Sequence, residues 1–389
     1  MLAVGTGEGR VRLVDAATGT TRWEVQSFTE SKPTTIRFCL VAMSPDGRLV
    51  ASVGGDGENW TVWDAARGVV CMTGARHDGT GACSCRVARS GRSLDQGCPV
   101  QAHTAAVFAV AFSPCGQRLA TGGYDNAVIL WDAQTWKADL VLQGHTGGLS
   151  SLSFSATGVR LASGSRDGSI RIWDATTGGL LRTIDQAHNA WCVHFSRTDD
   201  SRLASVEYTS SLVKQWDVNT GEMLREAEGH RFAVYSPDGR TIATGDYSNT
   251  RVVLLVEAET GALRLRMAGH QHQVFSASWS VDGSKLASGS FDGTCNSRVR
   301  YSHRGGGGWE LRWVHSPLGR EDRDLAPDYR CSSQSRWGSS LFAHEQFHAR
   351  ERGRKREAVG RWHRAAVQNV RGKVLLSIFS RRTHHRNGQ

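Results

Sequence analysis

The chain has 389 residues, of which 39% are hydrophobic, so it is long enough to bury a sizeable core in one large repeat architecture or in two ordinary domains. Its 44 glycines and 13 tryptophans, against only 7 prolines, favour aromatic-bearing strands joined by tight turns and indicate an all-β fold. The net charge of +10 is unevenly placed, because 20 basic and 8 acidic residues follow Thr294 while 27 basic and 29 acidic residues precede the tail.

The cysteines and the apolar stretches restrict the compartment. Nine cysteines at irregular positions do not form the pattern of a disulfide framework. The first seven residues lack the basic start and apolar run of a secretory signal, and apolar stretches such as Val252 to Val256 are too short to span a bilayer. We therefore expect a soluble protein of the cytoplasm, with the nucleus as the alternative, and no membrane partner.

Residues 1–26 read as three strands, the second, third and fourth of a four-stranded unit that lacks its first strand. A repeated unit follows, in which short apolar strands are separated by Ser-Pro-Asp-Gly, Asp-Gly and Thr-Gly turns that suit antiparallel hairpins. The six copies begin at Ala42, Ala111, Ser153, His194, Val234 and Ser278.

Two independent markers give the period of the repeat. The tryptophans are 42 and 43 residues apart, at Trp131, Trp173 and Trp216. The histidines are 42, 43, 42 and 40 residues apart, at His103, His145, His188, His230 and His270. This period is typical of a four-stranded propeller blade.

An insertion interrupts the repeat at about residues 73–98 and separates Trp63 from Trp131 by 68 residues. We predict a long surface loop. It contains four residues that could ligate zinc, namely His77, Cys83, Cys85 and Cys98. Because they include no Cys-x-x-Cys pair with a distant partner pair, we expect no metal there.

The ring can close in two ways. The last repeat supplies its first two strands at Val274 to Trp279 and Lys285 to Ser288, and these could complete the fragment at residues 1–26 as one composite blade. This arrangement predicts six blades. Seven blades are the alternative if the tail contributes strands. We therefore divide the chain into a propeller at 1–294 and a basic tail at 295–389 that is largely irregular or disordered.

The tail contains two motifs. His344-Glu345-Gln346-Phe347-His348 matches HExxH, the spacing of two zinc ligands in metalloproteases, but no third ligand stands at a recognised spacing. The second motif is a basic cluster that could contact phosphates or act as a nuclear import signal, formed by Arg350, Arg352, Arg354, Lys355, Arg356, Arg361, Arg364, Arg381, Arg382 and Arg386. A solvated, disordered segment is the alternative. The abrupt loss of the repeat also leaves open a translated intron or a shifted frame, and the same question applies to the insertion and to the N-terminal start.

The spaced Trp-Asp pairs resemble the WD40 repeat family. These pairs are Trp63-Asp64, Trp131-Asp132, Trp173-Asp174 and Trp216-Asp217, and Gly-His pairs at Gly144-His145, Gly229-His230 and Gly269-His270 precede first strands. The resemblance covers roughly residues 1–294 and implies a β-propeller with a structural tetrad of Asp, His, Ser or Thr, and Trp in each blade.

Two blades have the complete tetrad that the resemblance implies, listed as His103, Thr121, Asp125 and Trp131 in one and His145, Ser163, Asp167 and Trp173 in the other. The blade with His188, Ser205 and Trp216 lacks the Asp, and the next blade has Val256-Glu257 where Trp-Asp would stand. Since the histidines occur once per blade, we interpret them as structural hydrogen-bonding residues, with no catalytic residue, metal or cofactor.

The family pattern also implies a partner-binding rim, because residues early in the first strand and just before the turn Asp face one side of such a ring. These are Phe108, Tyr124, Arg166, Trp191, Phe275 and Phe291. Packing between blades is the alternative role for each. We expect a non-catalytic scaffold, monomeric by itself, that binds peptides or proteins within a complex. The alternatives are nucleic-acid or anionic-surface binding through the tail and, more remotely, an HExxH zinc hydrolase.

Overall fold

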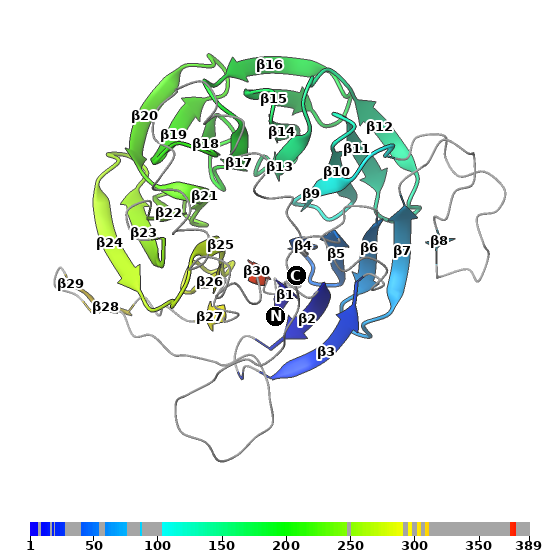
Figure 1. The fold of residues 1–389 in the computed structure, drawn as a ribbon, viewed down its shortest axis with the longest axis horizontal. Coiled ribbons are helices and arrows are strands. Elements are labelled where there is room, and N and C mark those ends of the chain that lie inside the picture. The colour runs from blue at the N-terminus through cyan, green and yellow to red at the C-terminus, as the bar shows by residue number, and fades with distance from the viewer. Residues whose placement is uncertain are drawn as a thin grey trace, which may run out of the picture.

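A computed structural model describes residues 1–6, 9–15, 18, 20–27, 40–53, 59–75, 86–87, 103–246, 250–290, 295–297, 302–304, 308–310 and 374–378. These residues form seven antiparallel β-sheets arranged as blades around a ring, together with one separate hairpin (Figure 1). The described residues include no helix, and so no helix long and apolar enough to cross a membrane. The predicted all-β propeller is confirmed.

We number the blades in chain order. Blade 1 contains β1 (Leu2–Thr6), β2 (Arg10–Val14), β3 (Thr21–Gln26) and β30 (Val374–Ile378). Blade 2 contains β4 (Leu40–Met43), β5 (Leu49–Val53), β6 (Asn59–Asp64), β7 (Val70–Ala75) and the short β8 (Arg86–Val87). Blade 3 contains β9 (Val107–Phe112), β10 (Arg118–Gly123), β11 (Val128–Asp132) and β12 (Ala138–Leu142).

The remaining blades repeat this plan. Blade 4 contains β13 (Leu149–Phe154), β14 (Arg160–Ser165), β15 (Ser169–Asp174) and β16 (Leu180–Asp185). Blade 5 contains β17 (Ala190–Phe195), β18 (Arg202–Glu207), β19 (Leu212–Asp217) and β20 (Met223–Glu228). Blade 6 contains β21 (His230–Tyr235), β22 (Thr241–Gly245), β23 (Val252–Glu257) and β24 (Leu263–Ala268). Blade 7 contains β25 (Val274–Trp279), β26 (Leu286–Ser290) and β27 (Cys295–Ser297), and the hairpin is β28 (Ser302–Arg304) with β29 (Gly308–Glu310).

The turn residues of the repeat explain its hairpins. In the Ser-Pro-Asp-Gly turn between β4 and β5, Ser44 Oγ donates to Asp46 Oδ1 at 2.6 Å, and the Gly47 N–H donates to the Ser44 carbonyl at 2.9 Å. Gly47 has a φ of 70°, a left-handed conformation that glycine adopts without steric cost. In the Trp-Asp turn, Asp132 accepts the backbone N–H of Thr135 at 2.6 Å and that of Gln134 at 3.0 Å. The first of these bonds is the main cause that lowers the pKa of Asp132.

The core lies between successive blades. Ala109 and Leu130 of blade 3 share one buried cluster with Leu149, Leu161 and Trp173 of blade 4. Leu130, Leu149 and Leu161 are fully buried. Since each sheet packs against its neighbours on both sides, the ring is held by a repeated face-to-face interface rather than by one central core.

The ring does not close through the predicted composite of residues 1–26 with β25 and β26, and that prediction is wrong, because blade 1 is instead completed by β30. The inner edge of β1 pairs with β30, from Leu2 opposite Ile378 to Thr6 opposite Val374, and β30 packs between β25 of blade 7 and β4 of blade 2. The outer edge of β26 pairs with β27. Because both edges needed for the composite are occupied, the fragments belong to separate blades, and the count is seven, as expected when the tail contributes strands.

The described part of the insertion adds to blade 2. β7 ends at Ala75, and β8 pairs with it along Met72 opposite Val87 and Thr73 opposite Arg86. The four residues considered as zinc ligands, at positions 77, 83, 85 and 98, lie outside the described residues.

Candidate functional site

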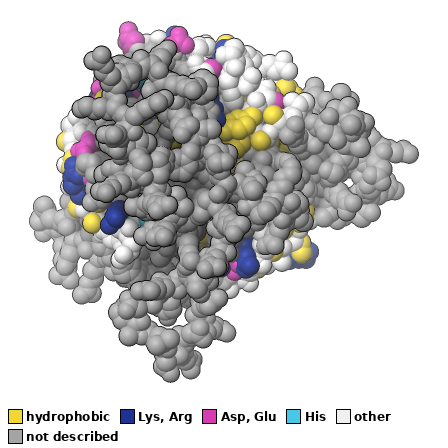
Figure 2. Space-filling model, in the orientation of Figure 1, with side chains coloured by type: hydrophobic (Ala, Val, Ile, Leu, Met, Phe, Trp, Pro, Cys, Tyr) yellow, Lys and Arg dark blue, Asp and Glu magenta, His cyan; other side chains and the backbone are white. Residues whose placement is uncertain are grey.

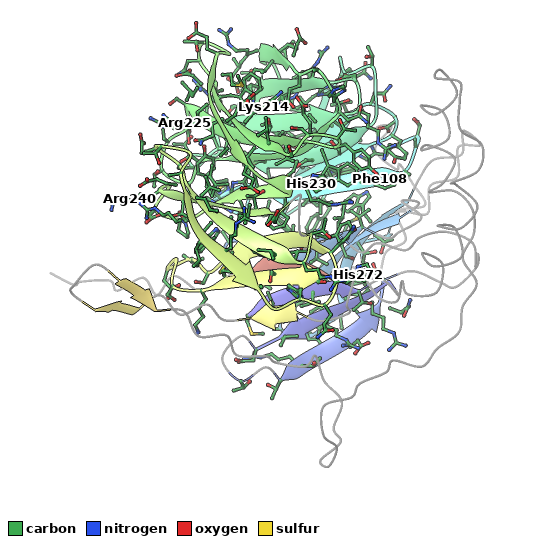
Figure 3. The ribbon with its side chains drawn as sticks, turned by 60° about the vertical axis from the view of Figure 1, so that its left-hand side comes forward. Phe108, Lys214, Arg225, His230, Arg240 and His272 are labelled. Atoms are coloured by element: carbon green, nitrogen blue, oxygen red, sulfur yellow. The ribbon has the colours of Figure 1, made fainter. Side chains whose placement is uncertain are left out.

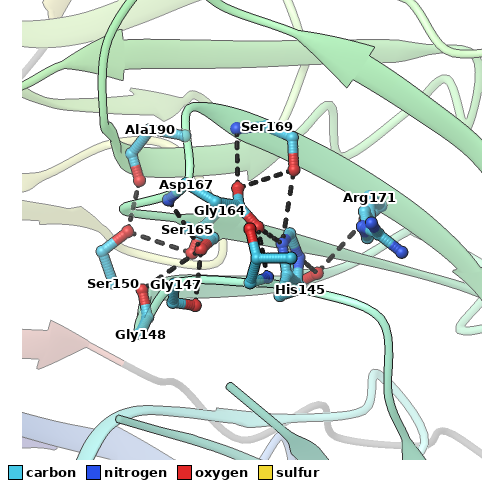
Figure 4. A network of polar contacts seen from close by, with 12 residues as sticks. His145, Gly147, Gly148, Ser150, Gly164, Ser165, Asp167, Ser169, Arg171 and Ala190 are labelled. Atoms are coloured by element: carbon cyan, nitrogen blue, oxygen red, sulfur yellow. Dashed lines mark hydrogen bonds and ion pairs between the residues drawn. The ribbon is translucent and has the colours of Figure 1, made fainter.

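Blades 3 and 4 each contain a hydrogen-bonded tetrad that joins the second and third strands to the segment before the first strand and to the turn after the second. In blade 4 the Trp173 indole N–H donates to Ser163 Oγ at 2.8 Å, and Ser163 Oγ lies 2.8 Å from His145 Nε2. His145 Nδ1 lies 2.8 Å from Asp167 Oδ2, as Figure 4 shows. In blade 3 the corresponding contacts are 2.8, 2.8 and 2.9 Å, among Trp131, Thr121, His103 and Asp125.

Electrostatics fixes the proton positions in the blade 4 tetrad. Burial lowers the pKa of His145, so its imidazole is neutral. Burial would raise the pKa of Asp167, but hydrogen bonds from Ser169, Thr146 and His145 outweigh it and hold this pKa well below its usual range. An ionised carboxylate only accepts, so His145 Nδ1 holds the proton and Nε2 accepts from Ser163. The side chains of the tetrad thus satisfy one another's hydrogen-bonding groups.

Blade 5 differs from its sequence-based prediction. Gln186, not His188, occupies the histidine position, because Gln186 Nε2 donates to Ser205 Oγ at 2.6 Å while Trp216 donates to the same oxygen at 2.8 Å. The His188 side chain is exposed. Alignment on the histidine spacing therefore selected the wrong residue by two positions.

In blade 6 the Gly229-His230 pair does not precede the first strand, because His230 is itself the first residue of β21. Its Nδ1 lies 3.0 Å from the Ser210 carbonyl oxygen of blade 5. Only six residues separate His230 from Ser236 of the next turn, whereas ten separate His145 from Ser155. This shortening moves the histidine out of the tetrad position.

Blades 5 and 6, which lack a complete tetrad, each contain a buried carboxylate that pairs with a cation. In blade 5 Lys214 Nζ lies 2.6 Å from Glu207 Oε1, and the Glu207 side chain is only 4% exposed. In blade 6 Arg266 pairs with Asp246, which is also buried. Both carboxylates lie at the end of the second strand of their blade, so each blade has a buried acidic group near the rim that a neighbouring cation neutralises.

The candidate binding site is the rim on which the first strands begin. Phe108, Trp191, Arg231 and Phe275 are each the second residue of the first strand of their blade. Tyr124, Arg166 and Tyr208 each follow directly after the second strand. In Figure 3, Phe108 and His230, next to Arg231, lie on one side of the ring and Arg240 lies on the other. Figure 2 views the side of Phe108, where hydrophobic side chains gather near β9 and β13.

The rim residues contact one another in a series. Phe108 stacks on Tyr124 with ring centroids 4.2 Å apart, and the Arg166 guanidinium carbon lies 4.5 Å from the Tyr124 centroid. Tyr124 also lies against Gly148 of blade 4 so closely that a Cβ on this glycine would come within 2.3 Å of its ring. Blades 3 and 4 thus hold this tyrosine in a fixed orientation.

A second set continues around the rim. Trp191 and Tyr208 have centroids 5.0 Å apart, and the Arg231 guanidinium carbon lies 4.9 Å from the Phe275 centroid. Tyr208 lies near enough to Arg231 to influence its pKa, which burial lowers. We call the following six residues the arc: Tyr124, Arg166, Trp191, Tyr208, Arg231 and Phe275.

Two members of the arc were not predicted from the sequence. Tyr208 was missed because Thr209 follows it where Asp follows Tyr124 and Arg166, so the turn lacks its usual marker. Arg231 was missed because the shortened start of blade 6 disguises the first-strand position. Alignment on the strand end, at Tyr235 and Phe195, would have found it. The predicted rim residue Phe291 lies outside the described residues, as do the HExxH motif and the basic cluster of the tail.

Within the described ranges no group of three His, Cys, Asp or Glu side chains could hold a metal ion.

Comparison with known proteins finds a similar repeat in three segments of the chain. Residues 96–132, 136–174 and 261–296 match the WD domain, G-beta repeat family. Telomerase protein component 1 of Rattus norvegicus is 29% identical over 199 residues, which cover 48% of this chain and 7% of that protein. Nuclear distribution protein PAC1 of Coccidioides posadasii is 30% identical over 190 residues, which cover 45% of this chain and 40% of that protein.

A solved structure agrees in fold. A chain in the crystal structure of a mitotic checkpoint complex superposes with a TM-score of 0.60 at 19% identity, over 75% of this chain and 81% of that one. Three segments of the chain are thus similar to WD40 repeats and the fold is that of a β-propeller, so the predicted resemblance is confirmed. The matched segments span less than half of either relative named above.

Proposed function

We propose that the protein is a non-catalytic scaffold that binds peptides or partner proteins on the rim of its propeller, within a multiprotein complex. The observation that supports this function is the arc, in which four aromatic rings and two guanidinium groups lie on one rim. Aromatic and arginine side chains are the residues that contribute most to protein interfaces, because they bury large rigid surfaces and make forked hydrogen bonds.

The partial exposure of the arc favours binding over internal packing alone. Phe108, Tyr124, Trp191 and Phe275 are half-buried and Arg166 is exposed, so each is held by the blades and still presents a surface. Tyr208 is 41% exposed although its ring contacts Trp191. A held but accessible aromatic side chain loses little conformational entropy when a partner binds.

The wider assignment belongs to the same proposal. The protein acts without a cofactor, its propeller is monomeric by itself, and it works in the cytoplasm, with the nucleus as the second compartment. Support comes from relatives whose names place them in assemblies, such as the mitotic checkpoint complex and an anaphase-promoting complex subunit, cdh1 of Dictyostelium discoideum.

This function is tested by comparing the proteins that bind to the wild type with those that bind to two matched variants. The rim variant combines Tyr124→Ala, Trp191→Ala and Phe275→Ala. The control variant combines three exposed residues of the outer strands, Leu181→Ala, Met223→Ala and Leu263→Ala, which are 50%, 47% and 41% exposed. We expect quantitative mass spectrometry to find a set of proteins on the wild type and the control that is lost from the rim variant. Equal recovery on all three folded proteins would refute the proposal.

A further inference from the structure

The arc contains two cations, Arg166 and Arg231. Among the described residues, neither Arg166 nor Arg231 makes an ion pair. Of the carboxylates at the ends of the second strands, Glu207 pairs with Lys214 and Asp246 with Arg266, whereas Asp167 accepts a hydrogen bond from the neutral His145 and keeps its charge. Each of the two guanidinium groups is therefore available to a carboxylate of a partner, since no described side chain forms an ion pair with it.

Arg231 has an unfavourable backbone conformation and a buried donor that no described residue satisfies, two features that are typical of binding sites. Its φ of 71° lies in the left-handed region, which a side chain with a Cβ rarely adopts. Its Nε is buried and has no hydrogen-bond acceptor among the described residues. Backbone strain and an unsatisfied buried donor both reduce stability, and such features concentrate at binding sites. The rest of the guanidinium lies over Phe275, so its position is fixed before any partner arrives.

The order of the arc residues around the ring indicates which chemical groups a ligand would need in order to bind there. Arg166 belongs to blade 4, the Trp191–Tyr208 pair to blade 5, and Arg231 to blade 6, so an apolar surface lies between two cations. A guanidinium favours a carboxylate, with which it forms charge-assisted hydrogen bonds, and a tryptophan beside a tyrosine favours an apolar side chain.

We propose that the arc recognises an extended segment of a partner protein in which acidic side chains, Asp or Glu, stand on both sides of an apolar side chain. This inference rests on the proposed function and specifies its ligand. A nucleic acid would also offer anions and flat rings. The propeller residues before the tail contain 27 basic and 29 acidic residues, however, so the ring lacks the excess of positive charge that polyanion binding needs. Two isolated cations suit isolated carboxylates.

A selection from a phage-displayed library of random 12-residue peptides on the full-length protein tests the inference. We expect enriched peptides to contain acidic residues on both sides of an aromatic or aliphatic residue. A fluorescent synthetic copy of the best peptide is then compared with its copy in which every acidic residue is replaced by its amide. We expect the amide copy to bind at least about tenfold more weakly, since a charge-assisted contact is lost at each position.

Substitutions of the two arginines test whether each of them binds an acidic side chain of the peptide. Arg166→Ala and Arg231→Gly should each weaken the acidic peptide by about tenfold and leave the amide copy unaffected. Glycine is used at 231 because it accepts the left-handed backbone. Arg264→Ala, on the outer strand of the same blade as Arg231, is the matched control and should change neither affinity. Trp191→Ala should weaken both peptides.

Three other results would refute the charge inference, the proposed function or both. Enriched peptides without acidic residues that still depend on Trp191 would refute the charge inference and leave the proposed function intact. A selection that returns no peptide dependent on Trp191 would refute both. Displacement of the acidic peptide by a short oligothymidylate, lost in Arg166→Ala, would assign the arc to nucleic acid instead.

Discussion

Replacement of Thr121 by valine tests whether the tetrad stabilises its blade. Thr121 is fully buried, and its hydroxyl lies 2.8 Å from both the Trp131 indole nitrogen and His103 Nε2. Valine has nearly the same shape but leaves both of these groups without a partner. Each unsatisfied buried group costs about 1–3 kcal/mol, so Thr121→Val should lower the free energy of unfolding by roughly 2–6 kcal/mol.

The matched control is Thr121→Ser, because Ser163 occupies the same position in blade 4 with the same contacts. It keeps the hydroxyl and loses one buried methyl group, a change of about 1 kcal/mol. Urea unfolding followed by tryptophan fluorescence measures both variants against the wild type. If Thr121→Val lies within about 0.5 kcal/mol of Thr121→Ser, the hydroxyl does not stabilise the blade and the reasoning fails.

Three further predictions concern acidity, ring closure and the irregular blade. Burial lowers the pKa of His194 to about 3, below its value in the unfolded chain. The stability that the neutral imidazole contributes is therefore complete above roughly pH 6.5. It is lost at about 1.4 kcal/mol per pH unit as the pH falls towards the folded-state pKa. Urea midpoints should therefore fall less steeply with acid for His194→Asn than for the wild type, and parallel slopes would contradict this. Removal of residues 374–389 should lower the melting temperature and promote association through the uncovered edge of blade 1, whereas removal of 379–389 should not. Equal melting of the two truncated proteins by calorimetry would show that this strand does not close the ring. Gln186→Ala should lower the free energy of unfolding in urea by about 1–2 kcal/mol, and His188→Ala by less than about 0.5 kcal/mol. The reverse order would show that His188, and not Gln186, takes the histidine position of the tetrad.

The repeated positions could be predicted from the sequence because each has a local physical cause. Thr121 and Ser163 follow the same spacing from their histidines, and their tetrads depend only on residues of one blade. The predictions failed where an insertion or deletion shifts one strand relative to its markers. His188 and His230 keep the period of the repeat, but their side chains do not occupy its hydrogen-bonding position.

Long-range closure was beyond the reach of local patterns. No repeat signature marks Val374–Ile378, and its pairing with β1 satisfies backbone groups that are far away in the chain. Part of the arc was similarly hidden. Tyr208 and Arg231 come together because blades 5 and 6 are adjacent, and only the order of strands, not the residue types, reveals this.

The pairing of β1 with β30 also determines the order in which the blades can form during translation. Leu2 leaves the ribosome well before its partner Ile378, because blades 2 to 7 lie between them in the sequence. Blades 2 to 6 consist of neighbouring segments and can form as they emerge, whereas blade 1 must wait with an unpaired inner edge. The nascent protein thus exposes a strand edge until β30 has been made, and a chaperone that covers this edge would protect it until the ring can close.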